Sequence, residues 1–269
     1  MDYSVIVGII LGISAVVVGM IAKGASIAVL INPGAMIIIF VGTAAAIANA
    51  FTLKEIKRIP TLFKVLFTEQ KLYDPASIIK LLEDLSRQVR KEGLLSLEAN
   101  IEEINDPFIK KGLEMIVDGV NEQFLNDYMQ TEIEMMEERH HAGALVFSQA
   151  GMYAPTLGVL GAVVGLIGAL GNLDDTEKLG HSIAAAFVAT LFGIFTGYVL
   201  WHPFANKLKR KSSEEVIIKN MILEGLIQIL NGSNPMQLKQ KMMAFLNPQD
   251  RARLEKMEME SEIQSNEEE

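Results

Sequence analysis

The chain has 269 residues, of which half are hydrophobic and about a fifth are charged, and its mean hydropathy is +0.27. This value is high for a soluble domain of ordinary composition. The net charge of −9 argues against nucleic acid as a partner, and the lack of cysteine excludes disulfides, thiol catalysis and iron–sulfur clusters.

Most of the hydrophobic excess lies in four stretches that contain no Asp, Glu, Lys or Arg. They hold 20, 30, 34 and 28 residues and cover 3–22, 24–53, 140–173 and 179–206. About 20 apolar residues suffice for a helix to cross the hydrocarbon core of a bilayer. We therefore predict four transmembrane helices, at 3–22, 33–53, 145–173 and 179–206. The first is expected to remain in the mature chain, because Asp2 stands where a signal peptide carries positive charge.

Basic residues near the ends of spans mark the cytoplasmic side of a membrane protein. Four of them follow the second span, at 54, 57, 58 and 64, and four follow the fourth span, at 207, 209, 210 and 211. The connection between spans three and four is short and acidic. Both termini, and the segment between spans two and three, are therefore predicted to be cytoplasmic.

The predicted cytoplasmic domain, 54–141, carries helix signals throughout. Asp74 and Pro75 form a helix start, and Gly93 interrupts the amphipathic pattern that follows. After Gly119 the pattern runs without a breaker into span three, which predicts one long helix leaving the membrane.

The segment 207–246 is predicted to form cytoplasmic C-terminal helices. Ser212 with Glu215 indicates a capping box that begins one of them, and a short helix follows from Pro235. The remainder, 247–269, is acidic and predicted to be disordered. The predicted fold is an all-α membrane protein with four transmembrane helices and a large helical cytoplasmic domain.

The spans offer no Asp, Glu, Lys or Arg at mid-membrane. Proteins that transport ions ordinarily place an ionisable group there, so an ion would need a carboxylate from a partner. The third span instead has small residues at steps of four and three, namely Ala154, Gly158, Gly161, Gly165 and Gly168. Such stripes allow close helix packing in lipid, and a single one most often reflects packing within a bundle. Three of the four spans carry such a motif, which favours an oligomer or a tight heteromeric assembly.

Two prolines, Pro155 and Pro203, stand at matching ends of spans three and four, where a hinge to the cytoplasmic domain would lie. His181 and His202 are expected at the membrane interfaces. His140 and His141 are adjacent and face different directions, so no metal site is expected. No G-x-S-x-G, Walker or H-E-x-x-H pattern is present, so an enzyme is not predicted, and no cofactor is expected.

Four stretches carry a resemblance to a known family. They are "NPGAMIIIFVGT" at the start of span two, "RKEGLLSLE" at 90–98, "YAPTLGVLGAVVGLIGAL" at 153–170 and "AAAFVATLFGIFTGYVLWHPFANKLK" at 184–209. Over nearly its whole length the sequence resembles the MotA stator subunits of the bacterial flagellar motor. The resemblance implies a multi-pass protein of the inner membrane and a homopentamer around a dimer of the single-span subunit MotB, whose transmembrane aspartate carries the ion.

The resemblance also implies roles for particular residues. Pro155 and Pro203 would link ion passage to movement of the cytoplasmic domain, while Arg90 and Glu98 would engage the rotor protein FliG. Sodium-type relatives commonly have threonine where this sequence has Ala162, and also where it has Thr190. A dehydrated sodium ion needs oxygen ligands, so Ala162 favours protons.

Three alternatives are kept beside the proton-driven stator. One is a sodium-driven stator. Another is a TonB- or Tol-type energiser subunit, a related class with three spans. The third is a static membrane scaffold without ion flow, whose function would not respond to a proton uncoupler.

Overall fold

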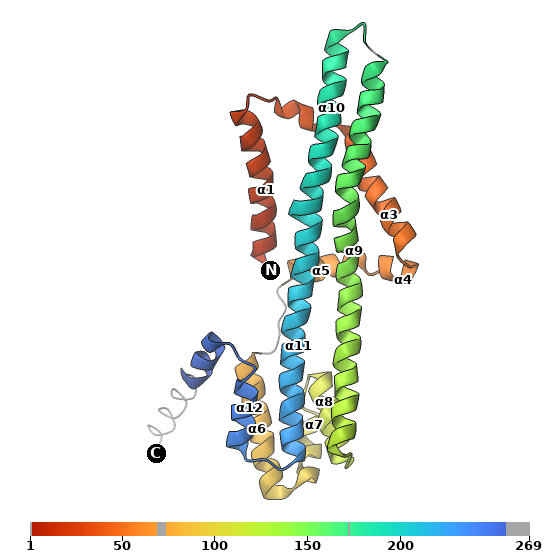
Figure 1. Cartoon of the computed structure of the whole chain (residues 1–269). Coiled ribbons are helices and arrows are strands. Elements are labelled where there is room, and N and C mark those ends of the chain that lie inside the picture. The colour runs from red at the N-terminus through yellow and green to blue at the C-terminus, as the bar shows by residue number, and fades with distance from the viewer. Residues whose placement is uncertain (1, 69–73, 172, 257–269) are drawn as a thin grey trace. The chain divides into compact units, whose positions relative to one another are not determined.

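The computed structural model describes residues 2–68, 74–171 and 173–256, and within these ranges the regular structure is helical, with no strand. The chain divides into two compact units. The first combines Met1–Gln70 with Arg139–Lys211, and the second combines Lys71–Glu138 with Ser212–Glu269. Figure 1 follows the elements along the chain.

The first unit begins with α1 and continues through a second, segmented span to two short helices. These elements are α1 (Tyr3–Ala22), η1 (Ile27–Leu30), α2 (Pro33–Met36), η2 (Ile37–Val41), α3 (Gly42–Ala50), α4 (Leu53–Ile56) and α5 (Ile59–Phe67). The Asn32 side chain caps α2 by accepting from the Ala35 amide at 3.1 Å and donates to the Ala185 carbonyl at 3.1 Å. One side chain thus starts the second span and ties it to the fourth.

Two long helical stretches complete this unit and extend into the second one. They are α9 (Glu122–Leu170) and the continuous series α10 (Thr176–Phe195), η4 (Thr196–Trp201) and α11 (His202–Leu230). The single helix α9 confirms the prediction of one helix running from the soluble segment into span three. Within the first unit, α9 and α10 lie side by side and are joined by a short connection (Figure 1).

Four helical stretches are long and apolar enough to cross a membrane, as predicted. They are Tyr3–Ala22, Ile27–Ala50, Glu122–Leu170 and Thr176–Leu230. The second ends at Ala50 rather than at 53, because Phe51 and Thr52 are extended and Thr52 caps α4 in a capping box with Glu55. The third ends at Leu170 rather than at 173.

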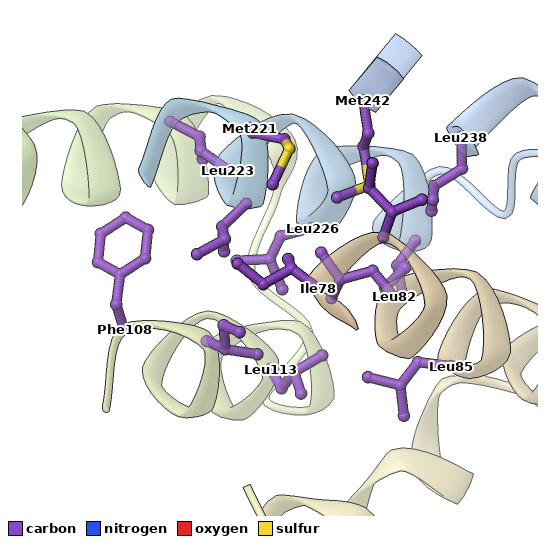
Figure 2. Close-up of a cluster of buried hydrophobic side chains, with 14 of the residues drawn as sticks. Ile78, Leu82, Leu85, Phe108, Leu113, Met221, Leu223, Leu226, Leu238 and Met242 are labelled. Carbon is purple, nitrogen blue, oxygen red and sulfur yellow. The ribbon is translucent and has the colours of Figure 1, made fainter. Parts of the chain in front are cut away.

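The second unit is a helical domain with its own core. Its remaining elements are α6 (Pro75–Glu92), η3 (Leu94–Leu97), α7 (Glu98–Ile101), α8 (Pro107–Val117) and α12 (Pro235–Met243). Figure 2 shows leucine, isoleucine and methionine side chains of α6, α8, α11 and α12 converging on one apolar cluster. Gly225 lets α11 approach α6, since an added Cβ would lie 2.7 Å from a Leu82 methyl.

Two local predictions for the C-terminal part were wrong. Helix α11 runs through Ser212 without a break, so no helix begins there. Residues 248–256 are helical and Leu254 packs into the core of the second unit, although a disordered tail was predicted from 247. In both places burial of apolar residues decides the conformation rather than the local signal. The predicted disorder of 257–269 lies outside the described residues.

Candidate ion-pathway and coupling site

The small-residue stripe of α9 packs directly against α10. A Cβ added to Gly158 would lie 2.9 Å from both the Ala189 carbonyl oxygen and the Gly193 Cα. Farther along α9, the corresponding distance from Gly161 to the Ala189 Cβ is 3.0 Å, and that from Gly165 to the Ala186 Cβ is 3.1 Å. Side chains larger than hydrogen therefore do not fit at these positions unless the helices separate.

On α10, Gly193 packs against the same small-residue stripe of α9. A Cβ on Gly193 would lie 2.6 Å from the Ala154 carbonyl oxygen and 2.7 Å from the Gly158 Cα. Its neighbours are backbone atoms, which cannot rotate away. The two helices thus meet backbone to backbone at this level. The predicted small-residue face thus forms a contact within the chain from Ala154 to Gly165, whereas an added Cβ on Gly168 would meet no atom within 4 Å.

Pro155 belongs to the same contact between α9 and the fourth span, three residues before Gly158. Helix α9 continues through it, although proline cannot donate to the carbonyl of Gly151. A Cβ on Gly197 of η4 would lie 2.8 Å from the Pro155 ring and 2.9 Å from the Gly151 carbonyl oxygen. The carbonyl released by the proline therefore faces a glycine of the fourth span.

The π-helical segment η4 ends two residues before Pro203. It is a π-helix over Thr196–Trp201, and Pro203 is the second residue of α11. Such segments accommodate helix breakers and recur at functional sites. Thr196 is buried and donates to the Phe192 carbonyl at 2.8 Å. The ring of His202 packs over Gly151, because a Cβ on that glycine would lie 2.8 Å from it.

The structure thus brings the surroundings of the two predicted coupling residues together. Pro155 contacts Gly197. His202, the residue before Pro203, contacts Gly151, which lies four positions before Pro155. Pro203 itself is exposed. Gly151, Gly197 and His202 were not predicted as part of this site, and His202 was expected only to be interfacial. The available signal was the Gly193–Gly197 pair, which resembles an ordinary packing motif.

The two residues predicted for the ion pathway lie beside the glycine contact. Ala162 follows Gly161 and Thr190 follows Ala189, the two residues that pack against each other. Both side chains are half-buried. Ala162 offers no polar atom and Thr190 offers one hydroxyl. No cluster of three or more metal-ligating side chains occurs among residues 2–68, 74–171 and 173–256.

Arg90 and Glu98 lie in the second unit on either side of a tight turn. Arg90 is in the last turn of α6, Glu98 begins α7, and both are exposed. Gly93 allows the turn with a φ of 85°, a value that favours glycine. The turn is held by hydrogen bonds from the Gln88 amide to the Ser96 carbonyl at 2.9 Å and from the Ser96 hydroxyl to the Gly93 carbonyl at 2.7 Å. The two opposite charges are thus presented at fixed places.

A polar cluster in the first unit joins the start of the chain to α11. Asp2 forms ion pairs with Lys207 at 2.7 Å and with Lys211 at 3.4 Å. The hydrogen bond from Lys207, a second from Ser4 and the two lysine charges hold the pKa of the Asp2 carboxyl well below its usual range. These contacts lie a few residues after Pro203.

Lys211 is the most buried member of this cluster. Its ammonium donates to the carbonyls of Val65 and Thr68, each at 2.7 Å. It therefore caps the C-terminal end of α5, where helix carbonyls lack intrahelical donors. From the sequence, Lys207 and Lys211 were expected only to mark the cytoplasmic side of the fourth span.

Comparison with known proteins gives consistent matches. Residues 100–221 match the MotA/TolQ/ExbB proton channel family, and residues 6–93 match the motility protein A N-terminal family. Motility protein A of Bacillus subtilis is 53% identical over 93% of both chains. The chain belongs to the motility protein A family. Motility protein A of Borreliella burgdorferi is 37% identical over 94% of this chain and 97% of that one.

The fold is that of solved members of this family. A chain of the flagellar MotAB stator complex from Bacillus subtilis superposes with a TM-score of 0.87 and 53% identity, covering 92% of this chain and 97% of that one. The chain is therefore a multi-pass membrane protein, with the function of a flagellar stator subunit from a proton channel family. This membership favours a non-enzymatic role and decides against the TonB- or Tol-type energiser.

Proposed function

We propose that this chain is the ring-forming subunit of a proton-driven flagellar stator. Five copies surround two copies of a single-span MotB-like partner, and the partner's transmembrane aspartate carries the proton. Two observations together carry the proposal. The spans contain no charged residue at mid-membrane, and the fold matches that of a MotAB stator chain with 53% sequence identity. A chain without its own mid-membrane carboxylate needs one from a partner.

The ion pathway runs beside the glycine contact of α9 and α10. A proton needs a carboxylate and a chain of water molecules, whereas a dehydrated sodium ion needs several oxygen ligands. Ala162 removes one such oxygen, and the hydroxyl of Thr190 remains. Protons are therefore the proposed ion, and no other cofactor is proposed.

Coupling is proposed to occur at the level of Pro155 and Pro203. Gly197 lies against the Pro155 ring and the Gly151 carbonyl oxygen, so a small shift between the helices changes this contact. One charge crossing the membrane supplies about 2.3 kcal/mol per 100 mV. That energy is enough to switch the helices between packing arrangements whose free energies differ by a few kcal/mol.

Rotor contact is proposed for Arg90 and Glu98. Both are exposed and opposite in charge, and the Gly93 turn sets their separation. Charged side chains at the rim of an interface steer association and set its register. The partner surface is that of the rotor protein FliG. Both chain termini and the second unit are placed in the cytoplasm, on the side of the basic residues that follow spans two and four.

The test is a deletion strain complemented with this chain, in which swimming is measured with and without sodium and with a proton uncoupler. We expect motility to be restored, to be independent of sodium and to be abolished by the uncoupler. Swimming that survives the uncoupler but requires sodium would establish the sodium-driven alternative. Restored motility that responds to neither would support a static scaffold.

A further inference from the structure

A cavity of about 250 Å³ lies within the first unit, at the end of the second span. Its wall includes Ala44 and Ile47 of α3, Ile59 and Phe63 of α5, and Trp201 of η4. The cavity is partly open to the surroundings of the chain. It is larger than the cavity of about 150 Å³ that suffices for a benzene-sized molecule.

The wall of this cavity suits an apolar occupant. Its side chains are aliphatic and aromatic apart from Thr43 and the indole of Trp201, and the polar atoms of these two are themselves buried without a hydrogen-bond partner in the described structure. An ordered water needs two to four polar partners, so these two atoms could hold a water at one point, but the other wall side chains offer it none. Since the wall belongs to membrane spans and to the amphipathic helix α5, a hydrocarbon chain is the apolar molecule at hand.

Two exposed basic residues are neighbours in the sequence of residues that line the cavity. Ile56 and Ile59 line it, and the two residues between them are Lys57 and Arg58, both exposed. The nearby acid Glu55 accepts hydrogen bonds from the Thr52 amide at 2.8 Å and from the Thr52 hydroxyl, and the charge of Arg58 has a smaller effect on its pKa. Across residues 2–68, 74–171 and 173–256, no ion pair shorter than 4.0 Å engages Lys57 or Arg58. Basic clusters that follow a span attract anionic lipid headgroups.

We propose that this cavity binds one acyl chain of an anionic phospholipid, with the phosphate held by Lys57 and Arg58. The apolar wall selects the chain and the cations select the headgroup. The site goes beyond the proposed stator function, because it needs neither ion flow nor rotor contact. It lies against η4, the segment that precedes Pro203, so the lipid would contact the helix region proposed for coupling.

Trp201 provides a direct test, because it is the single tryptophan of the chain and lines the cavity. The full-length chain with its co-expressed partner is reconstituted in phosphatidylcholine vesicles, and the fluorescence of the same complex with Trp201→Phe is subtracted. Phosphatidylglycerol or phosphatidylcholine with brominated acyl chains, which quench indole at short range, is then added as a minor component. We expect brominated phosphatidylglycerol to reach half-quenching at a mole fraction on the order of tenfold lower than brominated phosphatidylcholine.

Two pairs of variants separate the chain-binding and headgroup-binding parts. Ala44→Leu fills the cavity and should remove the excess quenching, whereas Ala45→Leu, at an exposed neighbour outside the wall, should retain it. Lys57→Gln with Arg58→Gln should abolish the preference for phosphatidylglycerol, whereas Lys23→Gln at the other end of the spans should not.

The wild-type comparison alone can overturn the proposal, so the result does not depend on the folding of any variant. Equal quenching by the two headgroups would refute the selection by Lys57 and Arg58. Excess quenching that persists in Ala44→Leu would refute the cavity as the site of the chain. Absence of quenching by either lipid would mean that another protein surface, such as a second copy of this chain, covers the cavity.

Discussion

Among the described glycines of the membrane spans, Gly193 comes closest to the backbone of a neighbouring helix, and it makes the sharpest prediction. Gly193→Ala would place a Cβ 2.6 Å from the Ala154 carbonyl oxygen and 2.7 Å from the Gly158 Cα. Neither atom can rotate away, so α10 must move from α9. Gly180→Ala in the same helix is the matched control, because its added Cβ meets no atom within 4 Å.

The expected magnitude follows from these distances. Restoring ordinary contact at about 3.4 Å requires a displacement of about 0.8 Å, and a gap of that size forfeits a quarter to a half of each dispersion contact along the interface. Overpacking of this kind costs about 1–3 kcal/mol. The better helix propensity of alanine returns about 0.5–1 kcal/mol. Gly193→Ala should thus destabilise the protein by up to about 2.5 kcal/mol, while Gly180→Ala should be neutral or slightly stabilising.

Two measurements check this expectation. The loss of stability is measured by unfolding the purified complex with heat or with a denaturing detergent. Swimming speed and single-motor torque in the complemented strain give the functional loss, which should be large because the perturbation is comparable with the energy of about 2.3 kcal/mol per proton per 100 mV. If Gly193→Ala matched Gly180→Ala in both stability and torque, the argument from close packing would be refuted.

Three further predictions concern other contacts. Gly197→Ala places a Cβ 2.8 Å from the Pro155 ring, so we expect torque to fall while binding of the partner is retained, as measured by co-purification; loss of the complex itself would show a purely structural role. Charge reversal at Arg90 or Glu98 should abolish swimming and leave unfolding of the complex unchanged, since both residues are exposed, and the double reversal should restore no more than part of the motility. Asp2→Asn should destabilise the protein by about 1 kcal/mol at neutral pH. Because the folded-state pKa of Asp2 is lowered, its contribution is present above the unfolded value of 3.8 and is lost as the pH falls through the lower folded value. The difference between Asp2→Asn and wild type should therefore shrink in acid, and a constant difference across pH would contradict the ion-pair account.

The membrane spans were predictable because their signal is local and strong. A bilayer offers no hydrogen-bond partners, so a run of about 20 apolar residues has to form a helix along its own length. The long helix α9 was predictable for a related reason, since no breaker interrupts its amphipathic pattern before span three. The helix-breaking role of Pro155 was also predictable, although the sequence does not show which helix its ring packs against.

The wrong predictions arose where a local signal competes with packing. Ser212 and Glu215 have the spacing of a capping box, but α11 continues through them from the fourth span. Residues 248–256 are mostly polar and charged, yet Leu254 is buried against the core of the second unit. Local propensities differ by less than about 1 kcal/mol per residue, so a few buried apolar contacts outweigh them.

The sequence by itself determined the four spans, their lack of charge and the small-residue stripe, because each is a property of consecutive or helically spaced residues. Only the tertiary structure decided what the stripe contacts. Gly158 meets Gly193, Pro155 meets Gly197, and Lys211 caps α5 from a distance of more than 140 residues along the chain. Such contacts depend on the relative placement of helices, which follows from the packing of whole surfaces rather than from any local pattern.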